Sequence, residues 1–116
     1  MPNYPDHLDR MFHALADPTR RAVVARLSAG PTSVSELAKP LSMSLPSVIQ
    51  HLQVLELSGL IESEKVGRVR TCRMAPGALA SAERWLTDLR TEWEARLNRL
   101  EAYLASTQKP EPGEET

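Results

Sequence analysis

The 116-residue sequence contains a single cysteine, Cys72, and this scarcity excludes several classes of protein. One thiol cannot form an intramolecular disulfide, and a cysteine-based zinc cluster would need ligands from other chains. No stretch approaches the roughly 18 apolar residues of a membrane span, and the N-terminus lacks the apolar segment of a signal peptide. We therefore expect a cytoplasmic protein without a membrane partner.

Charge of one sign and catalytic motifs are also scarce. The 14 lysines and arginines nearly balance 15 aspartates and glutamates, so the net charge of −1 does not indicate a polyanionic partner. The sequence has no Gly-rich phosphate loop and no evident nucleophile paired with a base. We therefore expect a protein that is not an enzyme and that has no cofactor and no metal.

The length favours one domain, expected over residues 1–106, and residues 107–116 form a Pro-, Gly- and Glu-rich tail expected to be disordered. Three short helices are predicted first, over about residues 5–16, 18–29 and 34–39. The second follows the capping residue Asp17, with Pro18 in its first turn. The third follows Ser33, with Glu36 at the capping-box position.

The segment with the most information is residues 44–73. Ser44 is a good helix N-cap, Pro46 suits a first turn and Gly59 ends the pattern, so a helix is predicted from about Leu45 to Ser58. Its apolar face carries Val48, Leu52 and Leu55 at helical spacing. Its polar face carries Ser47, Gln50 and Gln53.

Two β-prone runs follow that helix, Ile61–Val66 and Val69–Met74, and the tight link at Gly67 favours a hairpin. The hairpin carries Lys65, Arg68, Arg70 and Arg73, with no carboxylate between residues 65 and 73. A polar-faced helix beside a basic hairpin suits a nucleic-acid duplex. The helix can enter a major groove while the cations reach flanking phosphates.

A last helix is predicted from about Pro76 to Ser106, about 45 Å long at 1.5 Å per residue. Its apolar residues recur every three or four positions and form a stripe along the helix. The stripe consists of Leu79, Ala82, Leu86, Leu89, Trp93, Leu97, Leu100 and Leu104. This length exceeds what a compact domain of this size needs, so a second copy of the chain is expected to cover part of the stripe. The predicted interface residues are Leu8, Met11, Phe12, Leu86, Leu89, Trp93, Leu97 and Leu100.

Three segments, ALADPTRRAVVARLSAG, SVSELAKPLSMSLPSVIQHLQVLELSGLI and VGRVRTCRMAP, occur in an order that resembles the ArsR-type winged-helix repressors of bacteria. The resemblance covers about residues 6–105. It implies a mainly α fold with a small β-hairpin, a winged helix-turn-helix with long N- and C-terminal dimerisation helices. It further implies a homodimer that represses transcription by binding double-stranded operator DNA, with residues 44–58 as the recognition helix and 61–74 as the wing.

The known metal sites of that family find no match in this chain. Many members bind metal through a Cys-x-Cys pair in the third helix, where this sequence has Ser33 and Ser35. Others use Asp and His on the last helix, which has no histidine here. The resemblance therefore points to a metal-independent branch, and it supplies no inducer, so the effector is unknown.

The residues predicted to contact DNA are Ser44, Leu45, Pro46, Ser47, Ile49, Gln50, His51, Gln53, Lys65, Arg68 and Arg70. Several of these side chains have a second interpretation. Ile49 can contact a thymine methyl group or belong to the core, and His51 can bind a phosphate or pack as a half-buried neutral ring. Arg73 is less clearly a DNA ligand because strand alternation can turn it away.

Other residues and functions have alternatives as well. At least one of Arg20 and Arg21 is expected to have a structural role, and Trp85 and Trp93 suit interface core better than an effector pocket. Two alternative functions are considered: a metal- or thiol-responsive repressor that uses Cys72, and a protein-interaction module that does not bind DNA. The basic hairpin argues against the second.

Overall fold

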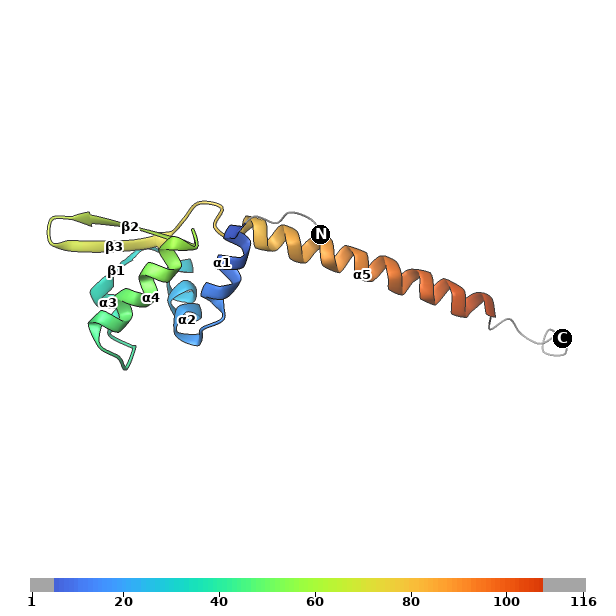
Figure 1. Ribbon diagram of the computed structural model, residues 1–116, viewed down its shortest axis with the longest axis horizontal. Helices are drawn as coiled ribbons and strands as arrows, with labels where there is room; N and C mark the ends of the chain where they lie inside the picture. The colour runs from blue at the N-terminus through green and yellow to red at the C-terminus, as the bar shows by residue number, and fades with distance from the viewer. Residues whose placement is uncertain (1–5, 108–116) are drawn as a thin grey trace. The chain divides into compact units, whose positions relative to one another are not determined.

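The computed structural model describes residues 6–107 (Figure 1). In chain order its elements are α1 (Asp6–Leu15), α2 (Pro18–Ser28), β1 (Thr32–Ser33), α3 (Val34–Ala38), α4 (Leu45–Leu57), β2 (Ile61–Val66), β3 (Val69–Met74) and α5 (Ala80–Thr107). The chain divides into two units between Ala82 and Glu83. This mainly helical fold with a small antiparallel sheet confirms the predicted fold class. The predicted tail, apart from Thr107, lies outside the described residues.

Three helices of the first unit begin at the predicted capping residues. In each case a side-chain oxygen accepts a backbone amide of the first turn, which satisfies a donor that the helix itself cannot. The bonds join Arg20 N to Asp17 Oδ2 at 3.0 Å, Glu36 N to Ser33 Oγ at 3.2 Å, and Ser47 N to Ser44 Oγ at 3.3 Å. The Glu36 carboxylate pairs with Lys39 at 2.8 Å.

The end of α4 turns the chain directly into the sheet. Gly59 has φ of 82°, the left-handed conformation that favours glycine after a helix. Its amide donates to Glu56 O at 3.0 Å and the Leu60 amide donates to Leu55 O at 3.1 Å, the paired bonds of a Schellman motif. The buried Ser58 hydroxyl also donates to Leu55 O, at 2.7 Å. These bonds fix where β2 begins relative to α4.

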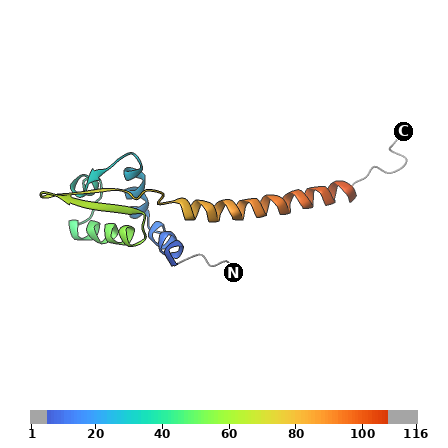
Figure 2. The ribbon, with the colours of Figure 1, turned by 90° about the horizontal axis from the view of Figure 1, so that it is seen from above.

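The sheet has three antiparallel strands in the order β1-β3-β2. β2 and β3 have the predicted bounds and turn at Gly67, where φ is 64°. The hairpin tip projects beyond the helices of the first unit in both views (Figures 1 and 2). β1 was not predicted: it is only two residues long, and it pairs Thr32 with Cys72 and Ser33 with Thr71.

The core of the first unit draws apolar side chains from every helix and from the sheet. Its buried members include Leu8, Met11, Ala14, Val23, Val24, Leu27, Leu37, Val48, Leu52, Leu55, Leu60, Ile61 and Cys72. Two predicted dimer-interface residues, Leu8 and Met11, are among them. Leu8 is 4% exposed and Met11 is 3% exposed within the single chain, so neither leaves a useful surface for a partner.

α5 begins four residues later than predicted. Gly77 has φ of 65°, and turn bonds join Ala78 N to Ala75 O and Ala80 N to Gly77 O, so the residues after Pro76 form turns instead of helix. Leu79 therefore precedes the helix. Among the described residues, no helix is long and apolar enough to cross a membrane.

The second unit consists of α5 from Glu83 onward. Arg96 and Glu92 pair on it at 2.6 Å, and Arg90 and Glu94 at 3.8 Å, both at the i, i+4 spacing that supports a solvated helix face. The predicted stripe is exposed within the single chain, with Trp93 at 59%. The exposed members of the stripe on this unit are Leu86, Leu89, Trp93, Leu97, Leu100 and Leu104. Tyr103, which the prediction did not include, is exposed as well, whereas Ala82 of the first unit is buried.

Candidate nucleic-acid interface

The buried side chains of α4 show which face of the helix packs on the core and which face is left accessible. Val48, Leu52 and Leu55 are buried, as their spacing predicts. Gln50 and Gln53 are exposed on other sides of the helix. The polar face therefore carries uncharged groups that can both donate and accept hydrogen bonds, which is what base edges in a major groove require.

The start of α4 is equally accessible. Ser44, Leu45 and Pro46 are exposed, and the Ser44 hydroxyl donates to Ser47 Oγ at 3.0 Å while it caps the helix. Ser47 itself is half-buried. Ile49 is 40% exposed, so the surface interpretation of this side chain holds and the core interpretation does not. Exposed apolar atoms at this place can contact a thymine methyl group.

His51 is held by the N-terminal turn of α2. Its Nδ1 lies 3.2 Å from Arg20 Nη1 and 3.9 Å from Asp17 Oδ2, and its side chain is 23% exposed. The Arg20 amide, which donates to Asp17, holds the pKa of that carboxyl below its ordinary value. The His51 ring is therefore half-buried, and its Nδ1 is in hydrogen-bond contact with Arg20.

Arg20 and Arg21 of α2 both have structural partners at the end of α1, as expected for at least one of them. Arg20 Nε donates to Ala14 O at 2.7 Å and its Nη2 donates to His13 O at 3.2 Å. Arg21 Nη1 donates to Leu15 O at 2.8 Å. These carbonyls end a helix and have no partner within it, so the guanidinium groups stabilise that end.

The four wing cations separate into two pairs. Arg73 contacts Glu62 at 3.2 Å and Glu64 at 3.4 Å across the hairpin, as strand alternation allowed. Arg70 Nη1 donates to Ser63 Oγ at 2.8 Å, and the Ser63 hydroxyl bonds to the Glu56 carboxylate of α4. The sequence shows no acid between residues 65 and 73, but strand pairing brings these carboxylates beside the basic strand.

The side chains of Lys65 and Arg68, next to the turn, make no hydrogen bond or ion pair within the described residues and are exposed. Lys65 also lies directly opposite Arg70 in the β2–β3 register. Like charges opposite one another destabilise an antiparallel pair. A bound polyanion would neutralise these two positive charges and remove the repulsion between them.

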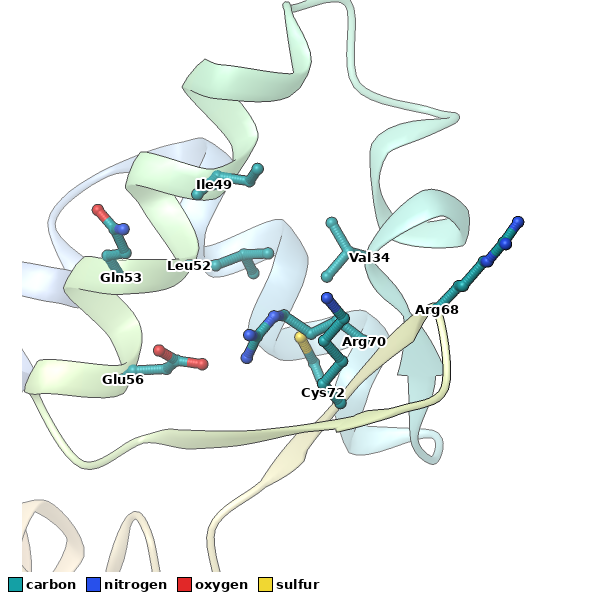
Figure 3. A pocket seen from close by; sticks show the side chains of 9 residues that line it. Val34, Ile49, Leu52, Gln53, Glu56, Arg68, Arg70 and Cys72 are labelled. Carbon is teal, nitrogen blue, oxygen red and sulfur yellow. The ribbon is translucent and has the colours of Figure 1, made fainter.

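A hollow of about 440 Å³ joins α4 to the wing (Figure 3). Its lining residues are Val34, Ile49, Leu52, Gln53, Glu56, Lys65, Arg68, Arg70 and Cys72. It brings together five of the predicted DNA-contact residues, from a helix and a hairpin that are separate in the sequence. Glu56 and Arg68 lie at opposite ends of it, and Arg68 extends away from the hollow in Figure 3.

Sequence reasoning missed two polar groups at this place, Glu56 and Ser63. They link α4 to both strands of the wing through Arg70. Neither belongs to a recognisable motif, and only the folded register brings them together. The assignment of Arg70 changes as a result, because its guanidinium braces the wing and is not simply a free cation for DNA.

Cys72 is fully buried and lines the hollow. Burial raises the pKa of its thiol above the ordinary value, and the Glu56 charge adds to that effect, while Arg70 opposes it. A reactive sensor thiol needs the reverse, a lowered pKa and access to solvent. In the described part of the chain, no three His, Cys, Asp or Glu residues group as metal ligands would.

Four helices followed by a β-hairpin wing, with α3 and α4 as the helix-turn-helix, define a winged helix-turn-helix protein. A family model described as a helix-turn-helix domain matches residues 15–64. The HTH-type transcriptional regulator Rv2034 of Mycobacterium tuberculosis is 44% identical over 89 residues, which are 77% of this chain and 80% of that protein. The arsenical resistance operon repressor of Escherichia coli is 31% identical over 96 residues, 82% of this chain and 80% of that one.

Solved structures agree with these relatives. The crystal structure of an ArsR family transcriptional regulator is 52% identical, with a TM-score of 0.75 over 81% of this chain and 97% of that one. An ArsR-like transcriptional regulator from Rhodococcus is 34% identical, with a TM-score of 0.72 over 84% and 92%. The chain belongs to the ArsR family of transcriptional regulators.

We predict that Cys72 behaves as a packed residue and not as a switch. Because its thiol is buried with a raised pKa, it should react with iodoacetamide at pH 8 much more slowly in the folded protein than in urea. Cys72→Ser should lower the free energy of unfolding by about 1–3 kcal/mol, the cost of burying an unmatched hydroxyl. Peroxide should leave DNA affinity unchanged, and rapid alkylation of the folded protein would contradict this assignment.

Proposed function

We propose that a homodimer of this chain binds a pseudo-palindromic operator in double-stranded DNA and represses transcription by occluding a promoter. α4 enters the major groove of each half-site, and the two helices are spaced about one turn, ~34 Å, apart. Ser44, Leu45, Pro46, Ser47, Ile49, Gln50, His51 and Gln53 provide the helix contacts. Lys65 and Arg68 bind phosphates from the wing, and Arg70 holds the wing while adding its charge.

The hollow between α4 and the wing is the observation that carries this proposal. Gln53 and Ile49 of the helix line the same concave surface as Lys65 and Arg68 of the wing. One duplex can therefore meet groups that read base edges and groups that bind phosphates at the same time. A net charge of −1 does not oppose this function, because the local arrangement of the charge sets the binding surface.

The exposed stripe of α5 supports the dimer. Leu89, Trp93 and Leu97 lie on a helix whose i, i+4 ion pairs occupy other positions, and a monomer rarely exposes so continuous an apolar surface. Phe12 of α1 is also exposed, at 38%, while Leu8 and Met11 are not available. We assign the interface to Phe12 and the α5 stripe.

We infer that repression by this chain does not depend on metal, because serines stand at the positions where many family members bind metal through a Cys-x-Cys pair. Ser33 caps α3 through its hydroxyl, a structural role that occupies one of the two serines at the Cys-x-Cys position. Derepression by some effector would require a ligand that favours a dimer unable to fit the half-site spacing. A cytoplasmic location and an absence of enzymatic activity accompany this function.

We predict that the wing tip supplies the salt-sensitive part of DNA binding. Lys65→Gln with Arg68→Gln removes four cations from the dimer, so the slope of log affinity against log salt should become shallower by about 3 to 4. Fluorescence anisotropy with the duplex upstream of the protein's own gene measures this slope.

Arg73→Gln is the matched control because Arg73 is paired with Glu62 and Glu64. It removes one cation per chain from the same hairpin and should leave the slope nearly unchanged. Equal slopes for the wild type and the double variant would exclude phosphate binding by the wing tip. A wild-type protein that binds no duplex at low salt would refute the proposed function itself.

A second prediction concerns the α5 stripe. Leu97→Glu places a carboxylate among exposed apolar side chains, so it should convert the dimer into a 12.9 kDa monomer in sedimentation and strongly weaken operator binding. Asn98→Glu adds the same charge one residue away, off the stripe, and should remain dimeric. A Leu97→Glu protein that still sediments as a dimer would place the interface elsewhere.

A further inference from the structure

The contact between Arg20 and His51 determines which nitrogen of the imidazole ring carries the proton. Arg20 Nη1 lies 3.2 Å from His51 Nδ1. A guanidinium group is always charged and can only donate hydrogen bonds. Nδ1 must therefore accept, and a ring that accepts at Nδ1 carries its single proton on Nε2.

The guanidinium group is held in place independently of His51. Its Nε donates to Ala14 O at 2.7 Å and its Nη2 donates to His13 O at 3.2 Å. Two backbone carbonyls at the end of α1 thus fix its plane, and Nη1 is left to point at the ring. The Asp17 carboxylate, 3.9 Å from Nδ1, would favour the opposite tautomer, but the Arg20 contact is the shorter one.

The ring also borders an open surface. His51, Gln50, Gln53, Arg20, Val54 and Leu57 line a hollow of about 360 Å³. Gln50 and Gln53 belong to the proposed DNA face, and the charge of Arg20 makes the hollow attractive to an anion. Within the described residues no hydrogen bond to Nε2 is recorded.

We propose that Arg20 is a positioning residue that fixes His51 as the Nε2–H tautomer, so that a neutral ring donates a hydrogen bond to a DNA phosphate oxygen. This inference rests on the proposed function. It explains why His51 contributes a donor without needing a second proton. Protonation at Nδ1 would bring two donors face to face and break the Arg20 contact.

The first test is the tautomer in the free protein. Long-range ¹H–¹⁵N NMR of the full chain should show His51 with a protonated Nε2 and an unprotonated Nδ1. Arg20→Gln should shift the ring toward a mixture, because the Asp17 carboxylate can then bind an Nδ1–H. A wild-type ring protonated mainly at Nδ1 would overturn the proposal without any DNA measurement.

The second test measures DNA affinity with two isosteric variants. The amide nitrogen of His51→Gln replaces the Nε2 donor, whereas His51→Asn keeps an acceptor at the Nδ1 position and loses the donor. His51→Asn should weaken binding to operator and to unrelated duplex alike, by roughly tenfold or more for two lost contacts in a dimer. His51→Gln should bind more tightly than His51→Asn, because it keeps a donor at the Nε2 position.

A double-mutant comparison separates positioning from direct contact. Arg20→Gln should weaken binding in the wild-type background and cost little in the His51→Gln background, because glutamine has no tautomer to fix. Equal losses in both backgrounds would overturn the positioning role, and melting temperatures exclude unfolding as the cause. If His51→Asn binds duplex as tightly as the wild type, this inference fails while the proposed function stands. If the wild type binds no duplex, the proposed function fails and the NMR result still decides the tautomer.

Discussion

The packing of α4 against the hairpin is the constraint on which the rest of the molecule depends. Leu52 and Leu55 bury one side of the helix, and Cys72 of β3 closes the core beneath the wing. The Schellman turn at Gly59 then starts β2 at a fixed position. Because one side of α4 is taken, its remaining polar side and the wing tip must share the accessible concave surface, and this geometry makes the first unit suited to a duplex.

Side-chain hydrogen bonds also hold α4 in place at two points. Near its C-terminal end, Glu56 bonds to Ser63, which accepts from Arg70, so the helix is joined to both strands of the wing. Near its middle, His51 is joined to α2 and through Arg20 to the end of α1. Hydrogen bonds of this kind add little net stability each, but they restrict orientation. The cations left outside these ties, Lys65 and Arg68, are at the place where a phosphate backbone can pass.

How far the sequence predicts this arrangement depends on whether a feature is local. The helix caps and the hairpin bounds were predicted correctly, because Ser44, Gly59 and Gly67 determine the backbone conformation only of the residues next to them. β1 was missed because two residues carry no periodicity and pair with a strand about 40 positions away. The sequence also did not predict the hydrogen bond of Arg70 to Ser63, or the burial of Leu8 and Met11 within one chain. An apolar or charged residue does not itself indicate which other part of the fold will contact it. The predicted contacts with DNA and with a second copy remain predictions.

A map of amide chemical shifts, recorded as the ¹⁵N-labelled protein is titrated with its upstream duplex, would show directly whether α4 and the wing bind DNA together. If α4 and the wing bind the duplex together, the largest changes fall on Gln50 and Gln53 of α4 and on Lys65 to Arg68 at the wing tip, with smaller changes at Glu62 and Arg73. Changes confined to α5, or spread evenly over the chain, would contradict a shared surface of α4 and the wing as the DNA interface.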